Sequence, residues 1–521
     1  MRAQDHHKGA PGEFTRRDFL VRAGAGGLGA ALAGLAPDFQ LSAAVAFAPP
    51  PMVAKPPGEL HFQSATALAK AIRSKKVSSL EVVEACLKRI EAVNPKLNAV
   101  VQLTAEKARE EARAADAALA RGQSKGPLHG VPMTIKDALD TTGVVSTGGT
   151  KGRAKFIPAQ DATTVARLRA AGAILLGKTN VPEMSWASET DNIIYGRTNN
   201  PYEFSRTPGG SSGGEAAIIA AGGSPFGLGS DLGGSIRLPA HYCGITGLKP
   251  TSGRVPRTGH FPPAGGMKDS MCQVGPLGRF VEDLTLVLPI IAGPDWRDPA
   301  IVPAPLGDPR KVNLKKLRVA FHTDNGILAA DAATAGTVRK AVKALSDSGA
   351  QVEEARPTGI EQSRELIEGV WGADGGAGLQ ELLKAASTTE LSPLLQHSLK
   401  KVGGLTPMSG PQLAALLFRW DQFRSEMLGF MEMFDLILCP VNAYPAAVHG
   451  ISFVEGRLNA FSYTYTYNLT GWPGAVVRGG ASPEGLPIGV QVVARPWRED
   501  VALAVAQHLE SALGGWQRPL L

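Results

Sequence analysis

Two glycine-lined segments of the chain each carry serines that could act on a substrate. Residues 209–215 read GGSSGGE, and residues 229–240 read GSDLGGSIRLPA. Because glycine has no Cβ, consecutive glycines let backbone N–H groups converge on one point without a side chain in the way. An oxygen that gains negative charge during acyl transfer is stabilised at such a point, typically by about 3 kcal/mol for one donor. The N–H groups of Gly233, Gly234 and Ser235 are therefore expected to form an oxyanion hole.

A serine hydroxyl becomes a strong nucleophile only when a base accepts its proton, most often a histidine held by a carboxylate. His241 and His260 follow the serine segments, but neither has an evident carboxylate partner, so both are interpreted as structural or pocket-lining residues. Lys136 ends an apolar segment at 131–135, where burial would favour its neutral form. Its pKa would have to fall by about 3 units from ~10.4, which buried lysines achieve. The alternatives are an ammonium that reaches solvent or one that pairs with Asp137.

Three blocks together resemble the amidase signature family in their order and spacing: residues 131–137 (VPMTIKD), the Ser211-Ser212 turn and residues 229–240. Further blocks agree with the same family, namely GKTNVPE at 177–183, GRTNNP at 196–201, GLKPT at 247–251, GPL at 275–277, NLTGWP at 468–473 and GLPIGVQ at 485–491. The resemblance covers residues 60–515, and a long ordered set of this kind is far more specific than one short motif.

The resemblance implies a role for each polar residue of these blocks. Ser235 is the acylated nucleophile, Ser211 is a bridging serine on a cis peptide bond, and Lys136 is the base that acts through Ser211. The residues that form the oxyanion hole and bind substrate in this family are matched here by Leu232, Gly233, Gly234 and Ser235. The residues expected to hold the loops in place are matched by Ser212, Asp231 and Arg237.

The implied enzyme is a hydrolase that cleaves linear carbon–nitrogen amide bonds of small molecules. Its products are a carboxylic acid and an amine or ammonia, and esters and carbamates are expected side substrates because they form the same acyl-enzyme. No organic cofactor is required. No metal is implied either, because the sequence has no HExxH or other clustered ligand set, and the His6-His7 pair lies in the leader.

Residues 172–179 satisfy the nucleotide-binding expression GxxxxGK[ST]. A phosphate loop needs a flexible segment between the glycines and a helix after the lysine. Residues 173–176 are instead predicted to be a strand, and Pro182 opposes a helix that begins there. The nucleotide-binding interpretation is therefore rejected.

Residues 209–213 fit GxSxG, the nucleophile elbow of α/β-hydrolases, which would make Ser211 the nucleophile. His449 and His508 lie downstream, where that fold places its base, but neither is part of a recognisable motif. Pro208 is also awkward in the strand that an elbow requires. This interpretation is kept as an alternative.

Two further hypotheses belong to different classes. Members of the same family also act as amidotransferase A-type subunits that release ammonia from glutamine for a tRNA-linked substrate. A binding protein without catalysis could use the same fold, although all three polar residues of the relay are present. A chain that leaves the cytosol would not meet charged tRNA, which argues against the amidotransferase.

Strand-like and helical segments alternate along the chain, which predicts an α/β sheet with covering helices. The resemblance implies one large domain with a central mixed, twisted sheet and helices on both faces. A proline-rich linker candidate at 303–309 is expected to lie within one unit. Strands are predicted at 131–135, 173–176, 317–321, 435–438 and 488–493, and helices at 64–122, 162–171, 331–348 and from 499 onward.

The start of the chain resembles a twin-arginine export signal. Arg16 and Arg17 precede a weakly apolar stretch at 23–36, and the AVA at 44–46 fits a small-x-small cleavage site. That stretch is shorter than the ~20 strongly apolar residues of a spanning helix, so no permanent membrane span is expected. The mature protein is expected to be periplasmic or secreted, with the export machinery as a transient partner. The expected divisions are a leader at 1–48, a proline-rich connector at 49–59, the amidase signature domain at 60–515 and a tail at 516–521.

Composition agrees with a globular enzyme. The 521 residues are 44% hydrophobic and 19% charged, and the net charge of +7 is scattered without a basic run, so no nucleic-acid partner is expected. Four separated cysteines without a CxxC pair are predicted to be buried thiols, with a bridge between Cys243 and Cys272 left open. A homodimer is compatible with the family.

The sequence leaves the substrate class open among aryl, fatty acyl, peptide and carbamate groups. The variable segments that would form the pocket are residues 184–190 and 357–461. Aromatic residues within these segments or shortly after them can either line a pocket or belong to the core. They are Trp186, Trp371, Tyr463, Tyr465 and Tyr467.

Overall fold

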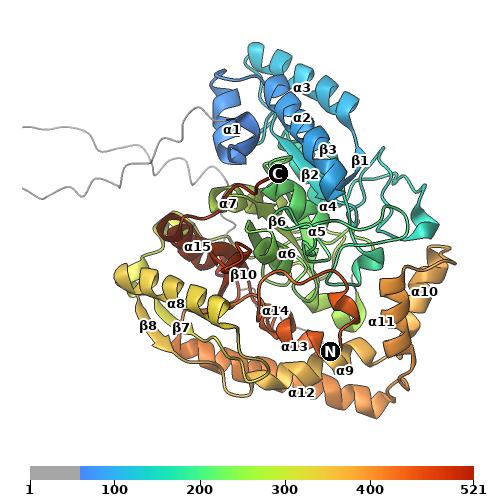
Figure 1. Ribbon diagram of the computed structural model, residues 1–521, viewed down its shortest axis with the longest axis vertical. Coiled ribbons are helices and arrows are strands. Elements are labelled where there is room, and N and C mark those ends of the chain that lie inside the picture. The colour runs from blue at the N-terminus through green and yellow to red at the C-terminus, as the bar shows by residue number, and fades with distance from the viewer. Residues whose placement is uncertain (1–58, 264) are drawn as a thin grey trace, which may run out of the picture. The chain divides into compact units, whose positions relative to one another are not determined.

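The computed structural model describes residues 59–263 and 265–521, whose strands form one 11-stranded sheet (Figure 1). The strands are β1 (Val100–Leu103), β2 (Pro132–Lys136), β3 (Ile174–Thr179), β4 (Phe226–Asp231), β5 (Thr246–Lys249), β6 (Gln273–Gly278), β7 (Arg318–Phe321), β8 (Gln351–Glu354), β9 (Leu436–Pro440), β10 (Gly474–Ala481) and β11 (Pro487–Ala494). Their order is β1-β3-β2-β4-β6-β5-β10-β11-β9-β7-β8. The pairs β2–β3, β2–β4, β7–β8 and β7–β9 are parallel and the other pairs are antiparallel, so the sheet is mixed, as expected.

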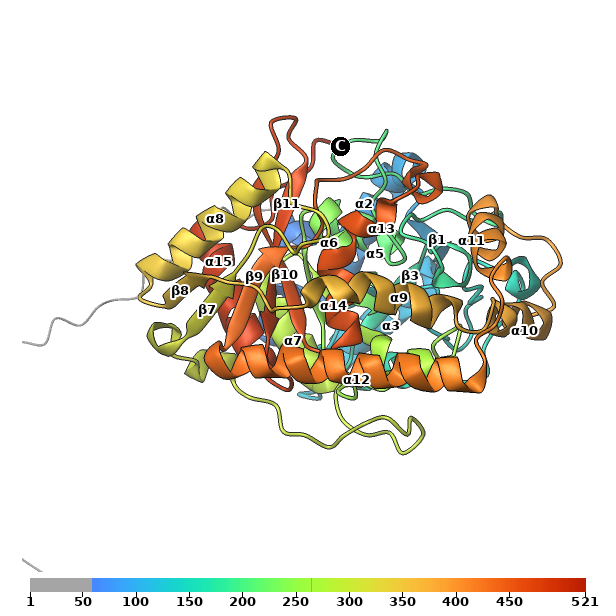
Figure 2. The same ribbon diagram turned by 90° about the horizontal axis from the view of Figure 1, so that it is seen from below.

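The strands on both sides of residues 303–309 belong to this sheet, which makes the described part a single α/β domain. The helices are α1 (Ala65–Arg73), α2 (Ser79–Leu97), α3 (Ala105–Ala120), α4 (Thr163–Ala170), α5 (Gly213–Ala220), α6 (Arg237–Tyr242), α7 (Val281–Ile291), α8 (Ala332–Asp347), α9 (Ser363–Gly372), α10 (Ala377–Ala385), α11 (Pro393–Gly403), α12 (Gly410–Met433), α13 (Arg457–Ala460), α14 (Ser462–Leu469) and α15 (Glu499–Leu513). Figure 2 shows α12 as the long helix that crosses the view near α9 and α14.

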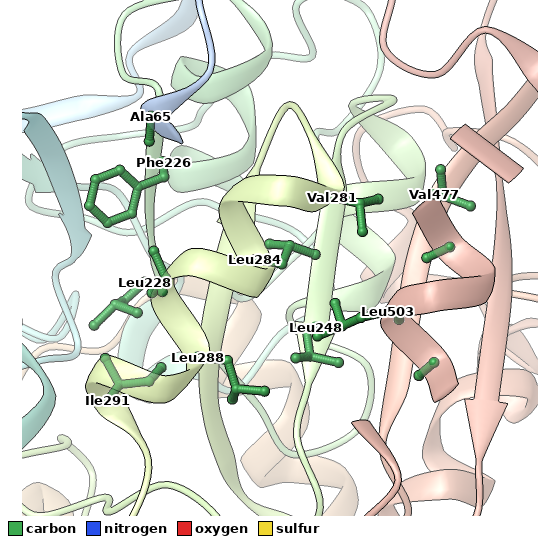
Figure 3. Packing of buried hydrophobic residues seen from close by; sticks show 14 of the residues in the cluster. Ala65, Phe226, Leu228, Leu248, Val281, Leu284, Leu288, Ile291, Val477 and Leu503 are labelled. Atoms are coloured by element: carbon green, nitrogen blue, oxygen red, sulfur yellow. The ribbon is translucent and has the colours of Figure 1, made fainter. Parts of the chain in front are cut away.

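Helices cover the sheet on both faces, and β9 shows why. Leu436 and Leu438 pack into one hydrophobic cluster with residues of α8 and α15, whereas Ile437 and Cys439 pack into another with residues of α12 and α14. Alternate side chains of a strand point to opposite faces, so a central strand that is apolar at every position needs helices on each side. Figure 3 shows the first cluster around α7, where Leu284 and Leu288 lie among side chains of neighbouring strands.

One part of the sequence prediction is wrong. The segment 64–122 was expected to be helical throughout, but β1 separates α2 from α3. Val100 and Val101 are β-branched, and this short segment pairs with β3 at the edge of the sheet. Ser78 and Glu81 form the capping box at the start of α2.

The pairing of β2 with β4 decides where the polar residues meet. These two strands are parallel, with Thr134 opposite Gly227 and Ile135 opposite Leu228. Their carboxyl ends therefore lie at the same edge of the sheet, where open α/β sheets usually bind ligands. Lys136 ends β2, and the turn containing Ser235 follows β4.

Candidate active site

Lys136 is fully buried at the end of β2. Its Nζ lies 2.6 Å from Ser211 Oγ and 2.9 Å from Ser230 Oγ. Burial lowers the pKa of Lys136 from 10.5 to about 7, although nearby acidic groups partly oppose the shift. A large share of the amine is thus unprotonated near neutral pH and can accept a proton.

Asp137, the next residue, is held away from this amine. Its Oδ1 lies 3.7 Å from Lys178 Nζ, and its Oδ2 accepts a hydrogen bond from Thr147 N over 3.0 Å. Successive side chains along an extended segment point in opposite directions, which separates the two neighbours. The alternatives in which Lys136 reaches solvent or pairs with Asp137 are therefore wrong.

Ser211 and Ser212 directly precede α5, and the peptide bond between Gly210 and Ser211 is cis, as the resemblance implies. Ser212 N donates to Ser235 O over 3.2 Å. Ser212 Oγ also lies 3.3 Å from both the backbone N and the backbone O of Ser230. Ser212 therefore joins the turn before α5 to the segment that carries Ser235.

Ser235 lies in the turn between β4 and α6 and is partly exposed. Within the described residues its hydroxyl has no hydrogen-bond partner, which leaves it accessible to a substrate. Gly234 differs from the expectation for an oxyanion donor, because its N–H donates to Asp231 Oδ1 over 2.8 Å. In the same part of the chain, the N–H groups of Leu232, Gly233 and Ser235 have no protein acceptor and are the remaining candidates.

A buried ion pair holds this turn. Arg237 Nε lies 3.0 Å from Asp231 Oδ2, and Arg237 Nη2 lies 2.9 Å from Asp231 Oδ1. Arg237 Nη1 also donates to Gln491 Oε1, and Asn468 Nδ2 donates to Asp231 Oδ1, each over 2.8 Å. Burial alone would raise the pKa of Asp231, but Arg237 holds it below its ordinary value. The ion pair thus anchors the turn to β11 and α14.

A family model described as Amidase matches residues 81–503. The chain belongs to the amidase signature family. An acylamidase of Rhodococcus erythropolis is 35% identical over 471 residues, covering 87% of this chain and 96% of that protein. The A-type subunit of the glutamyl-tRNA(Gln) amidotransferase of Moorella thermoacetica is 36% identical over 482 residues, covering 87% of this chain and 97% of that protein. The solved structure of 6-aminohexanoate cyclic dimer hydrolase superposes with a TM-score of 0.79 at 30% identity, covering 89% of this chain and 99% of that chain.

The amidase signature blocks did not assign a role to Ser230, and His260 was interpreted as structural or pocket-lining. The structure places both at the site, because Ser230 Oγ lies between Lys136 Nζ and His260 Nε2. A serine that immediately precedes Asp231 on a central strand was the available signal for Ser230. For His260 the sequence held no comparable signal, because its contact depends on how two distant loops pack.

The two rival motifs do not form the sites they suggested. In the GxxxxGK[ST] match, Lys178 lies on β3, is fully buried, and donates to Ser146 Oγ over 2.9 Å. In the GxSxG match, Ser211 Oγ forms its hydrogen bond with Lys136 Nζ and not with a histidine. The Nε2 atoms of His449 and His508 instead bond to the carbonyl oxygens of Phe204 and Ala344.

The aromatic residues considered as a pocket lining separate into two groups. Tyr463, Tyr465 and Tyr467 are buried core residues. Trp371 is only partly buried, and its ring would lie 3.3 Å from a Cβ at Gly233. Trp371 is therefore placed to contact a group bound beside the candidate oxyanion donors.

The described residues can also be examined for disulfide bonds, membrane-spanning helices and metal-binding groups. All four cysteines are free and buried, so Cys243 and Cys272 are not bonded. None of the helices in residues 59–263 and 265–521 has an apolar stretch long enough to cross a membrane. The same residues contain no group of three or more His, Cys, Asp or Glu side chains arranged to hold a metal ion.

Proposed function

We propose that this protein is a serine amidase that hydrolyses the carboxamide bonds of small molecules through an acyl-enzyme on Ser235. The observation that carries the proposal is the 2.6 Å contact between the buried Nζ of Lys136 and Ser211 Oγ. The next residue, Ser212, donates from its backbone N to Ser235 O, which joins this contact to the glycine turn that carries the accessible Ser235 and the free N–H groups. A buried amine, a bridging hydroxyl and an accessible hydroxyl are the parts that a proton relay to a carbonyl substrate requires.

The proposed reaction begins with neutral Lys136, which accepts the proton of Ser211 as Ser211 accepts the proton of Ser235. Ser235 Oγ forms a bond to the carbonyl carbon, and the N–H groups of Leu232, Gly233 and Ser235 stabilise the resulting oxyanion. The relay then returns the proton to the leaving nitrogen as the carbon–nitrogen bond breaks. Water repeats the sequence on the acyl-enzyme and releases the carboxylic acid.

The amidotransferase hypothesis is the second candidate, because the amidotransferase chain of Moorella thermoacetica is as similar to this chain as the acylamidase is. A protein of that kind would release ammonia from glutamine and depend on partner subunits. An amidase would act alone on N-acyl amides. A panel that includes glutamine, an anilide and an aliphatic amide separates the two, and activity confined to glutamine would favour the amidotransferase.

Covalent labelling with a fluorophosphonate tests the proposed nucleophile. Intact-mass and peptide mapping should find one adduct, on Ser235, and none in Ser235→Ala. Labelling of Lys136→Ala and Ser211→Ala should be at least about 100-fold slower, because a positioned base contributes about that much. An adduct on Ser211, or equal labelling of Lys136→Ala, would contradict the proposed relay.

We further propose that the chain is exported through the twin-arginine route and works in the periplasm or outside the cell. The leader lies outside the described residues, so the support is Arg16-Arg17 ahead of the weakly apolar stretch. Replacing both arginines by lysine should retain the full-length protein in the cytoplasm. Unchanged export of that variant would argue against the route. Light scattering of the mature chain would show whether it forms the homodimer compatible with its family.

A further inference from the structure

A second hydrogen-bonded arm leads from Lys136, apart from its contact with Ser211. Lys136 Nζ lies 2.9 Å from Ser230 Oγ, and Ser230 Oγ lies 2.8 Å from His260 Nε2. The other ring nitrogen, His260 Nδ1, lies 2.7 Å from Pro262 O. Both His260 and Ser230 are buried.

The direction of every hydrogen bond in this arm follows from its two ends. A carbonyl oxygen can only accept, so the proton of the neutral imidazole lies on Nδ1 and Nε2 is an acceptor. Burial, with Lys136 nearby, lowers the pKa of His260 to about 4, which keeps the ring neutral. Ser230 has one proton and must donate it to Nε2. Its oxygen is then left to accept a hydrogen bond from Lys136.

We propose that His260, acting through Ser230, is a positioning residue that orients the unprotonated Lys136 amine so that its lone pair faces Ser211. A neutral amine has two protons and one lone pair, and a proton directed at Ser230 leaves the lone pair free for Ser211 Oγ. Without the acceptor at His260, the Ser230 hydroxyl could rotate and donate to that lone pair. It would then compete with Ser211 for the base.

The backbone keeps the two ends of the arm in register. Phe261 N donates to Ala138 O over 2.7 Å, and Asp140 N donates to Gly259 O over 2.9 Å. The loop that carries His260 is thus bonded on both sides of the histidine to the segment that directly follows Lys136. This arrangement limits movement of the imidazole relative to the amine.

The charged and titratable groups around the arm come from several elements. Glu215 on α5, Asp231 at the end of β4 and Cys272 before β6 influence Lys136, and Arg257 influences His260. A neutral amide in place of His260 leaves all of these groups and the net charge unchanged. A slower reaction would therefore indicate that the Lys136 amine has lost its orientation, and not that the electrostatic field around it has changed.

Two amide variants separate orientation from simple packing. In His260→Gln the amide reaches the position of Nε2, so its oxygen can accept from Ser230. In His260→Asn the shorter side chain reaches only the position of Nδ1. His129→Asn is the matched control, because His129 is buried to a similar degree and both of its ring nitrogens bond to the backbone, to Lys125 N and Ala115 O.

The rate of fluorophosphonate labelling of Ser235, followed against pH, is the readout, with thermal midpoints measured for each variant. Above pH 8 we expect His260→Asn to label about tenfold more slowly, the effect of one misdirected hydrogen bond, while His260→Gln stays within about threefold of wild type. In both His260 variants, the pH at which labelling reaches half of its maximal rate should not increase. His129→Asn should lower the thermal midpoint without slowing labelling.

A double-mutant cycle gives the decisive comparison, because His260 is proposed to act only through Ser230. Ser230→Ala combined with His260→Asn should be as slow as Ser230→Ala alone. If the effects of the two substitutions on the labelling rate multiplied, the inference would be wrong. Labelling of His260→Asn at the wild-type rate would also overturn it. The inference rests on the proposed function, whose failure would look different: wild-type enzyme without an adduct on Ser235, or labelling indifferent to Lys136→Ala.

Discussion

At the scale of single residues, the unusual feature is an amine with its pKa near the working range of an enzyme. Lys136 must be neutral to accept a proton, and its pKa is about 7. The rate of Ser235 labelling should therefore rise about tenfold per pH unit below pH 7 and level off above about pH 8. A rate that is constant from pH 5 to 9 would exclude Lys136 as the titrating base.

The family blocks name the residues of the proposed relay, whose roles stay a prediction. Contact of Lys136 with Ser211 was expected, and the structure brings the two together. Two features could not be predicted. The N–H of Gly234 is taken by Asp231, which depends on the geometry of the turn, and His260 reaches Ser230 from a separate loop. No spacing along the chain encodes the contact between His260 and Ser230.

At the scale of elements, the turn between β4 and α6 depends on the ion pair between Asp231 and Arg237. Asp231→Asn keeps the shape of the side chain but leaves a buried guanidinium without its counter-charge, which typically costs about 3–5 kcal/mol. It also weakens the acceptor of the Gly234 N–H. We expect a lower thermal midpoint and labelling of Ser235 slowed at least about tenfold.

Glu499→Gln is the matched control for that prediction. Glu499 forms a buried ion pair with Arg254 at the start of α15, and neither residue belongs to the proposed relay or its turns. This variant should lower the thermal midpoint to a similar extent while labelling stays within about threefold of wild type. Equal slowing in both variants would mean that lost stability, and not the β4–α6 turn, controls the reaction.

The strands that were predicted from sequence have apolar, β-branched runs, as in β2 and β11. β4 was not predicted, because it lies in a glycine-rich segment whose glycines leave space for side chains of neighbouring residues. A Cβ at Gly227 would lie 1.9 Å from Glu215 Oε1, and one at Gly229 would lie 2.7 Å from Ser212 Oγ. Packing of α5 against β4 therefore removes the alternation by which a strand is recognised.

At the scale of the whole molecule, strand order brings together residues that are far apart in the chain. Lys136 at the end of β2 meets Ser230 on β4 because these two strands are neighbours, although β3 lies between them in sequence. Helices and strands could be predicted from local patterns, but the order β1-β3-β2-β4 could not. It is set by contacts between distant segments, for which the sequence alone offered only the family resemblance.

A buried base also affects the stability of the whole domain. The native pKa of Lys136, about 7, lies below its ordinary value of 10.5, so between these pH values the unfolded chain binds a proton that the native chain does not. The free energy of unfolding of the wild type should therefore rise with pH across this range. Lys136→Met removes the group, and its side chain fills a similar space in an apolar strand.

We expect Lys136→Met to be inactive in labelling yet to unfold about 2–4 °C higher than wild type at pH 7, after the cost of the hydrogen bonds that Ser211 and Ser230 lose. Because only the unfolded wild type binds the extra proton, the difference in thermal midpoint between Lys136→Met and wild type should be largest at and below pH 7. It should shrink toward pH 10. Scanning calorimetry at several pH values measures it. Lys343→Met, at an exposed site on α8, should change the midpoint by less than about 1 °C at every pH. A difference that grows with pH would mean that Lys136 is charged in the native protein, which is incompatible with its proposed role as base.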